Sequence, residues 1–128
     1  MSWTASSIAV CSIALLHVIF MVGELWPWSS PLVMNRVLQK WPKPLDLSPD
    51  DREFVSAIVH NAGIYNGIVA AGLFAAAVAG PGASSIEVAL LAGGIVAGLF
   101  GAATLTTATI AQAVLGAGAL VIVIWFPG

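Results

Sequence analysis

The chain has 128 residues, of which 59% are hydrophobic and 8% are charged, whereas a soluble domain has about 45–50% apolar and about 25% charged residues. This composition excludes an ordinary soluble globular protein, because too few charges remain to keep its surface in solution. The net charge of −2 also provides no positive field for binding a nucleic acid backbone. We therefore expect an integral membrane protein whose partner is the lipid bilayer and not a nucleic acid.

The charged residues are concentrated in one part of the chain. All but one of them lie between Glu24 and Glu53, and the exception is Glu87. The apolar remainder is long enough for four membrane spans of about 20 residues each. The predicted fold class is all-α, an integral membrane four-helix bundle in a single transmembrane domain (residues 1–128), with helices at about 4–26, 49–79, 85–104 and 107–126.

The first expected helix is apolar, whereas the segment after it is amphipathic. Residues 1–23 contain no Lys or Arg, so the basic start of a secretory signal is missing and we interpret the helix as a retained span. Cys11 is the single cysteine, which we interpret as a buried apolar side chain. An amphipathic pattern at 32–41 predicts a short helix that lies flat at the membrane interface, within the loop 27–48.

The basic residues predict the orientation in the membrane. All four Lys and Arg residues belong to the connection between the first two expected spans, so the positive-inside rule places the loop 27–48 in the cytoplasm. Both termini then face outward, and the expected location is the cell inner membrane, which the chain crosses several times. The tryptophans agree with this orientation, because an aromatic belt at each interface would contain them: Trp26, Trp28 and Trp41 inside, Trp3 and Trp125 outside.

The second and third helices have recognisable signals at their ends. Ser48 precedes Pro49 and two acidic residues, which predicts a capped helix start. The run Gly80-Pro81-Gly82 predicts the end of the second helix. Ser84 and Glu87 have the spacing of a capping box, so we expect the third helix to begin there with Glu87 as part of its cap.

Small residues four positions apart predict that the helices pack closely, because they let two backbones approach each other. The pairs are Gly63 and Gly67, Gly94 and Gly98, and Ala97 and Gly101.

Polar side chains inside the expected spans are the features that indicate chemistry, since ionisable groups at membrane depth are costly and face the bundle interior. His17 and Glu24 are seven residues apart, which is two turns, so they share one face of the first helix. His60 in the second helix is the third ionisable candidate. The remaining polar candidates are amides and a phenol that could orient a ligand: Asn61, Tyr65, Asn66 and Gln112.

Counting inward from the expected cytoplasmic ends places these residues in the cytoplasmic half of the bundle. The pattern predicts a polar pocket, open to the cytoplasm, for a lipophilic small molecule. His17, Glu24 and His60 are the candidate catalytic residues for acid/base chemistry of the isomerase, cyclase or hydratase type. The candidate ligand-binding residues are Asn61, Tyr65, Asn66 and Gln112.

Two alternatives stay open at this point, and so does the question of whether the chain is an enzyme. In the first, the protein is structural or an assembly partner, and its polar residues only join helix to helix by hydrogen bonds. In the second, it is a small transporter that works as a homo-oligomer, because four short helices rarely enclose a pathway alone.

No metal site and no cofactor are expected. The two histidines lie at different estimated depths and no C-x-x-C-H motif is present, which disfavours haem. The sequence also lacks H-E-x-x-H, a paired E-x-x-H and a Gly-rich phosphate loop, the usual signals of zinc, di-iron and nucleotide sites.

The same polar residues resemble the pattern of small bacterial membrane proteins grouped as domain of unknown function 1304. The resemblance rests on His17 and Glu24, on the string from Asn61 to Gly67, on the string from Ala97 to Thr104, and on Gln112. It covers nearly the whole chain and implies a four-span architecture, but no activity. The chain departs from the family pattern at Ala62, where Gln is usual, in the absence of a proline after Gln112, and in its long first loop.

Overall fold

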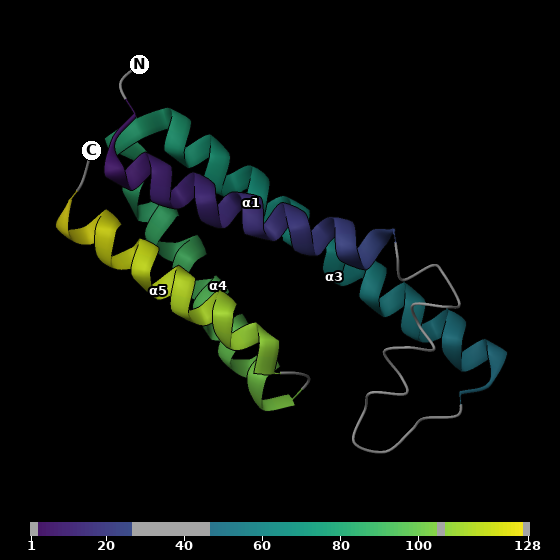
Figure 1. Cartoon of the computed structure of the whole chain (residues 1–128). Coiled ribbons are helices and arrows are strands. Elements are labelled where there is room, and N and C mark those ends of the chain that lie inside the picture. The colour runs from purple at the N-terminus through teal and green to yellow at the C-terminus, as the bar shows by residue number, and fades with distance from the viewer. Residues whose placement is uncertain (1–2, 27–46, 105–106, 127–128) are drawn as a thin grey trace. The chain divides into compact units, whose positions relative to one another are not determined.

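The computed structural model describes residues 3–26, 47–104 and 107–126 (Figure 1). The described residues form four α-helices and two short 3-10 helices, in the order α1 (Ala5–Leu25), α3 (Pro49–Ala79), η2 (Gly80–Ala83), α4 (Ser84–Thr104), η3 (Thr107–Thr109) and α5 (Ile110–Trp125). The predicted all-α fold class is confirmed. The largest difference from the expected ranges is at α5, which begins at Ile110 instead of residue 107. The predicted interfacial helix at 32–41 lies outside the described residues.

The helices α1 and α3 both begin at a hydroxyl side chain that accepts a hydrogen bond from a free backbone amide. The Ser7 amide donates to Thr4 Oγ1 over 3.2 Å, and the Asp51 amide donates to Ser48 Oγ over 3.2 Å. The Ser48 hydroxyl in turn donates to Asp51 Oδ2 over 2.6 Å. Asp50 and Asp51 occupy the first turn of α3, where the positive end of the helix dipole favours acidic groups. The predicted cap at Ser48 is therefore confirmed.

The connection between α3 and α4 differs from the prediction. Gly80 has φ of +76°, a left-handed conformation that glycine adopts without a steric penalty. The helix η2 then leads directly into α4, and both the amide and the hydroxyl of Ser84 donate to the Pro81 carbonyl, the hydroxyl over 2.6 Å. The helix begins at Ser84 as expected, but the capping box with Glu87 is wrong. A capping box would bind the Ser84 amide to the Glu87 side chain, whereas this amide donates to the Pro81 carbonyl of the preceding turn.

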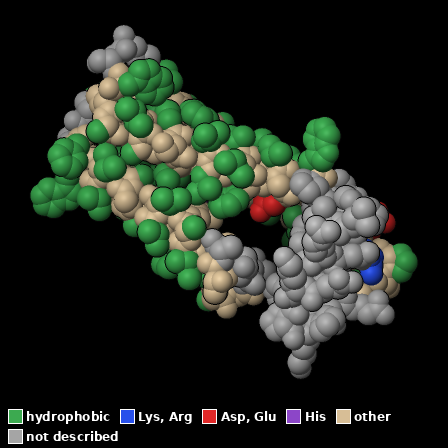
Figure 2. Space-filling model, in the orientation of Figure 1, with side chains coloured by type: hydrophobic (Ala, Val, Ile, Leu, Met, Phe, Trp, Pro, Cys, Tyr) green, Lys and Arg blue, Asp and Glu red, His purple; other side chains and the backbone are tan. Residues whose placement is uncertain are grey.

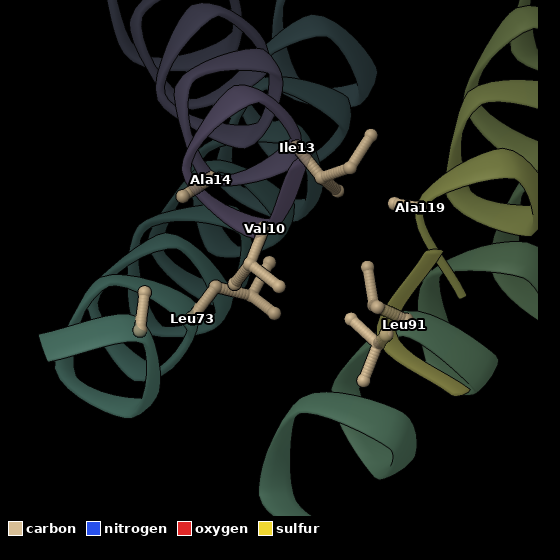
Figure 3. Close-up of a cluster of buried hydrophobic side chains, with 8 residues drawn as sticks. Val10, Ile13, Ala14, Leu73, Leu91 and Ala119 are labelled. Carbon is tan, nitrogen blue, oxygen red and sulfur yellow. The ribbon is translucent and has the colours of Figure 1, made fainter. Parts of the chain in front are cut away.

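The described residues belong to two compact units, and each is considered by itself. The first unit contains residues 1–16 and 69–128, and it has an apolar core to which four helices contribute. Figure 3 shows side chains from these helices directed toward a common region. Leu73 and Val10 are 0% exposed and Leu91 is 1% exposed. The other members of this core are Ile13, Ala14, Ala77, Ala119 and Val123.

In the first unit, α4 and α5 approach closely at a glycine. A Cβ atom added to Gly98 would lie 2.8 Å from the Ala113 backbone nitrogen and 3.0 Å from the Thr109 carbonyl oxygen. Gln112, at 9% exposure, crosses the same contact and donates from Nε2 to the Gly94 carbonyl over 3.0 Å. The close approach predicted from the small residues is therefore confirmed at Gly98.

Apolar side chains also cover the outside of the helices. On the face shown in Figure 2, hydrophobic side chains are abundant and charged side chains are few. Large apolar side chains are well exposed, for example Ile19 (59%), Ile68 (61%) and Val96 (67%). Two helical stretches, Ala5–Leu25 and Pro49–Thr104, have the length and hydropathy needed to cross a membrane, while the apolar helix α5 is shorter.

Candidate functional site

The candidate site lies in the second unit, residues 17–68, where the end of α1 packs against the first half of α3. Two glycines of α3 allow this contact. A Cβ atom on Gly63 would lie 3.0 Å from Leu25 Cγ, and one on Gly67 would lie 2.7 Å from Met21 Sδ. The later residue of α3 meets the earlier residue of α1, so the two helices run in opposite directions here.

Three of the predicted site residues meet in this contact. His17 Nδ1 and Asn66 Oδ1 are 2.7 Å apart, and Asn66 Nδ2 donates to Glu24 Oε2 over 2.8 Å. His17 is 3% exposed, and the Asn66 and Glu24 side chains are partly buried. A single amide of α3 thus links an imidazole and a carboxyl group that lie two turns apart on α1. We call these three side chains the His17 network.

The hydrogen bonds of the His17 network have a fixed direction. The Asn66 Nδ2 group only donates and its Oδ1 only accepts. A flipped amide would set Oδ1 against the Glu24 carboxylate, which is also an acceptor, so Glu24 holds Oδ1 toward His17. We therefore expect His17 Nδ1 to be the donor, which in the neutral imidazole leaves the free electron pair on Nε2.

Phe20 lies beside His17 on α1. Its ring stands nearly perpendicular to the imidazole, with an interplanar angle of 88° and ring centroids 6.1 Å apart. Such edge-to-face pairs are favourable beyond the area they bury. Sequence reasoning did not single out Phe20, although its spacing of three residues from His17 was a usable signal.

His60 lies in the same unit but forms no hydrogen bond with the His17 network. It is on α3, one turn before Gly63, and its Nε2 is buried without a hydrogen-bond partner among the described residues. A buried nitrogen of this kind usually binds a water molecule or a ligand. The catalytic role expected for His60 stays a prediction.

The remaining predicted ligand-binding residues lie elsewhere. Tyr65 is 63% exposed, and Asn61, one turn earlier on α3, is exposed as well. Neither forms a hydrogen bond with a described residue. Gln112 belongs to the first unit, where it binds the Gly94 carbonyl. The structure therefore brings together His17, Glu24 and Asn66, and the catalytic and ligand-binding roles of all the predicted site residues stay predictions.

Among the described residues, no group of three or more His, Cys, Asp or Glu side chains is arranged to hold a metal ion. The side chains of the His17 network can themselves form hydrogen bonds and take part in proton transfer.

The comparisons with known proteins identify a family. Neither the comparison with curated proteins nor that with solved structures found a match. Residues 11–124 match the family model described as protein of unknown function (DUF1304). This range contains the whole His17 network as well as the ends of α1 and α3 that form it. Because the match covers most of the sequence, the chain belongs to the DUF1304 family of proteins of unknown function.

Proposed function

We propose that this chain is an integral membrane protein in which the His17 network is the acid–base centre of a polar pocket for a lipophilic small molecule. The observation that carries the proposal is the directed pair of hydrogen bonds from His17 through Asn66 to Glu24. In this proposal the imidazole carries its proton on Nδ1, so Nε2 is the atom that can accept a proton.

A membrane location is supported by what surrounds the polar residues. Two helical stretches are long and apolar enough to span a bilayer, and large apolar side chains are exposed on all four helices. In this proposal the connection between α1 and α3 faces the cytoplasm and both termini face outward. Three of the four basic residues belong to that connection, and the fourth, Arg52, lies in the first turn of α3 directly after it. The bound molecule is lipophilic because it must enter through, or from, an apolar surface.

The hydrogen bonds of the His17 network would support an imidazole that gains and loses a proton during the reaction. When His17 Nε2 takes a proton from a C–H or O–H group of the substrate, the imidazole becomes cationic. Asn66 Oδ1 then accepts from a stronger donor, and the Glu24 carboxylate lies one amide away to offset the new charge. Asn66 positions the ring and does not pass the proton on, because its amide nitrogen already carries two hydrogens.

This arrangement fits reactions that remove a proton at one position and return it at another. Isomerisation of a double bond is the simplest of these, and cyclisation or hydration of an alkene uses the same acid and base steps. Exclusion of water by burial of His17 strengthens the electrostatic interactions within the network.

Native mass spectrometry of the full chain, gently extracted from the membrane in which it is expressed, tests the proposal. We expect the wild-type protein to retain a small apolar molecule, and His17→Leu to lose it. The variant Ser12→Ala is the matched control on α1, because the Ser12 hydroxyl is exposed and donates only to the Ile8 carbonyl of its own helix. It should retain the molecule.

A second variant separates a chemical role from a structural one. In Glu24→Gln the new side-chain oxygen still accepts from Asn66, but the negative charge is gone. We expect this variant to keep the stability of the protein and to lose conversion of the retained molecule. If His17→Leu, Glu24→Gln and wild type carry the same molecule in the same amount and differ only in stability, the network is structural and the proposal is wrong.

A further inference from the structure

Glu87 is the single acidic residue in the sequence of the first unit. The sequence of the first unit, residues 1–16 and 69–128, contains no other Asp or Glu and no Lys, Arg or His. The only other titratable side chain there is Cys11. No cationic side chain of this unit is therefore present to pair with the Glu87 carboxyl group.

The Glu87 side chain is nevertheless buried. It is 5% exposed, and it forms no hydrogen bond with a described residue. The structural role that its spacing suggested is absent, because Ser84 donates to Pro81 and does not form a capping box. A carboxylate that is removed from water without a cation or a donor is strongly unfavourable, whereas the neutral acid is not.

Glu87 stands in a stretch of α4 whose neighbouring residues take part in the apolar core of the first unit. Its helix neighbours Val88 and Leu90 pack against the core of the first unit, as Cys11 of α1 does. A thiol is only a weak hydrogen-bond donor and does not replace a cation.

We propose that Glu87 is a proton-binding site, occupied by one proton and separate from the His17 network. The carboxyl group is held as the neutral acid by its burial and by the lack of any cationic side chain in its unit. The small part of its surface that stays exposed is the route by which the proton is exchanged. Loss of the proton requires that water or a cation reach the carboxylate, so proton release is coupled to an opening of its surroundings.

Carbodiimide labelling of the full chain in phosphatidylcholine vesicles at neutral pH tests this proposal. The apolar reagent dicyclohexylcarbodiimide reacts with a protonated carboxyl group: its nitrogen takes the acid proton while the carboxyl oxygen adds to its central carbon. We expect peptide mass spectrometry to find the resulting adduct on Glu87. A water-soluble carbodiimide with a glycine ester should instead modify the exposed Glu53, which is the matched control.

The variant Glu87→Gln gives a second, independent measurement. An amide resembles the neutral acid, so we expect complete loss of the adduct and an unchanged melting temperature. The proposal is overturned if wild-type Glu87 escapes the apolar reagent, or if the water-soluble reagent modifies Glu87 as readily as Glu53. A clear fall in the melting temperature of Glu87→Gln also overturns it, since that fall would show an ionised carboxylate stabilised at the start of α4.

Discussion

The two units of this chain use the same two helices in opposite ways. The first part of α1 and the last part of α3 contribute apolar side chains to a core, of which Val10 and Leu73 are fully buried. The last part of α1 and the first part of α3 instead join through His17, Asn66 and Glu24. A directed pair of hydrogen bonds is geometrically more demanding than apolar packing, because the donors, the acceptors and their angles must all fit. We therefore expect the His17 network to specify the register of α1 against α3 in the second unit.

The largest expected loss of stability follows from a substitution in the apolar core of the first unit. Leu73→Ala removes a fully buried side chain from the core of the first unit, and the cavity and lost contacts should lower the free energy of unfolding by about 2–5 kcal/mol. Unfolding in mixed micelles, followed by circular dichroism, measures this change. Leu99→Ala is the control, because Leu99 is 57% exposed and should have little effect. Equal losses for the two variants would show that the apolar core is not where the structure places it.

A smaller loss of stability is expected from a substitution in the His17 network of the second unit. Asn66→Leu leaves His17 and Glu24 without their shared partner, which should lower the free energy of unfolding by about 2–3 kcal/mol. Asn61→Leu is the matched control on the same helix, since Asn61 is exposed, and it should be near neutral. If the two asparagine variants unfold alike, the hydrogen bonds of the network do not hold α1 to α3.

The smallest effect concerns the contact between α4 and α5. In Gly98→Ala the added methyl group meets the Ala113 backbone nitrogen at 2.8 Å, and relief of this overlap costs about 1–3 kcal/mol. The better helix propensity of alanine offsets about 1 kcal/mol, so a net loss of about 1 kcal/mol is expected. In Gly118→Ala nothing lies within 4 Å of the new atom, and the same unfolding measurement should show a gain. A gain at Gly98 would contradict the close approach.

Local signals in the sequence predicted the helices well, because each signal acts over only a few residues. Ser48 and Pro49 mark the start of α3, and the Gly80-Pro81-Gly82 run marks its end. The capping box predicted for Ser84 and Glu87 does not form. The reason is that the conformation of the turn before α4 decides which backbone amides need a cap. Gly80 allows that turn to continue into α4 as η2, and no spacing rule contains this information.

The site was predictable only in part. The seven-residue spacing of His17 and Glu24 placed both on one face of α1, and both bind the same amide. Which polar residue of α3 they meet depends on the rotation and register of two helices that are far apart in sequence. Asn66 and Tyr65 are adjacent and were equal candidates, yet only Asn66 faces α1 while Tyr65 is 63% exposed.

The tautomer of His17 tests the central claim most directly. Nitrogen-15 NMR of the full chain in lipid bilayers, with labelled histidine and the variant His60→Asn to leave His17 as the single histidine, reports which ring nitrogen carries the proton. Above the pH at which the ring is cationic, we predict a protonated Nδ1 and an unprotonated Nε2, and a loss of this preference in the additional presence of Asn66→Leu. A proton on Nε2, or a tautomer that Asn66→Leu leaves unchanged, would contradict the account.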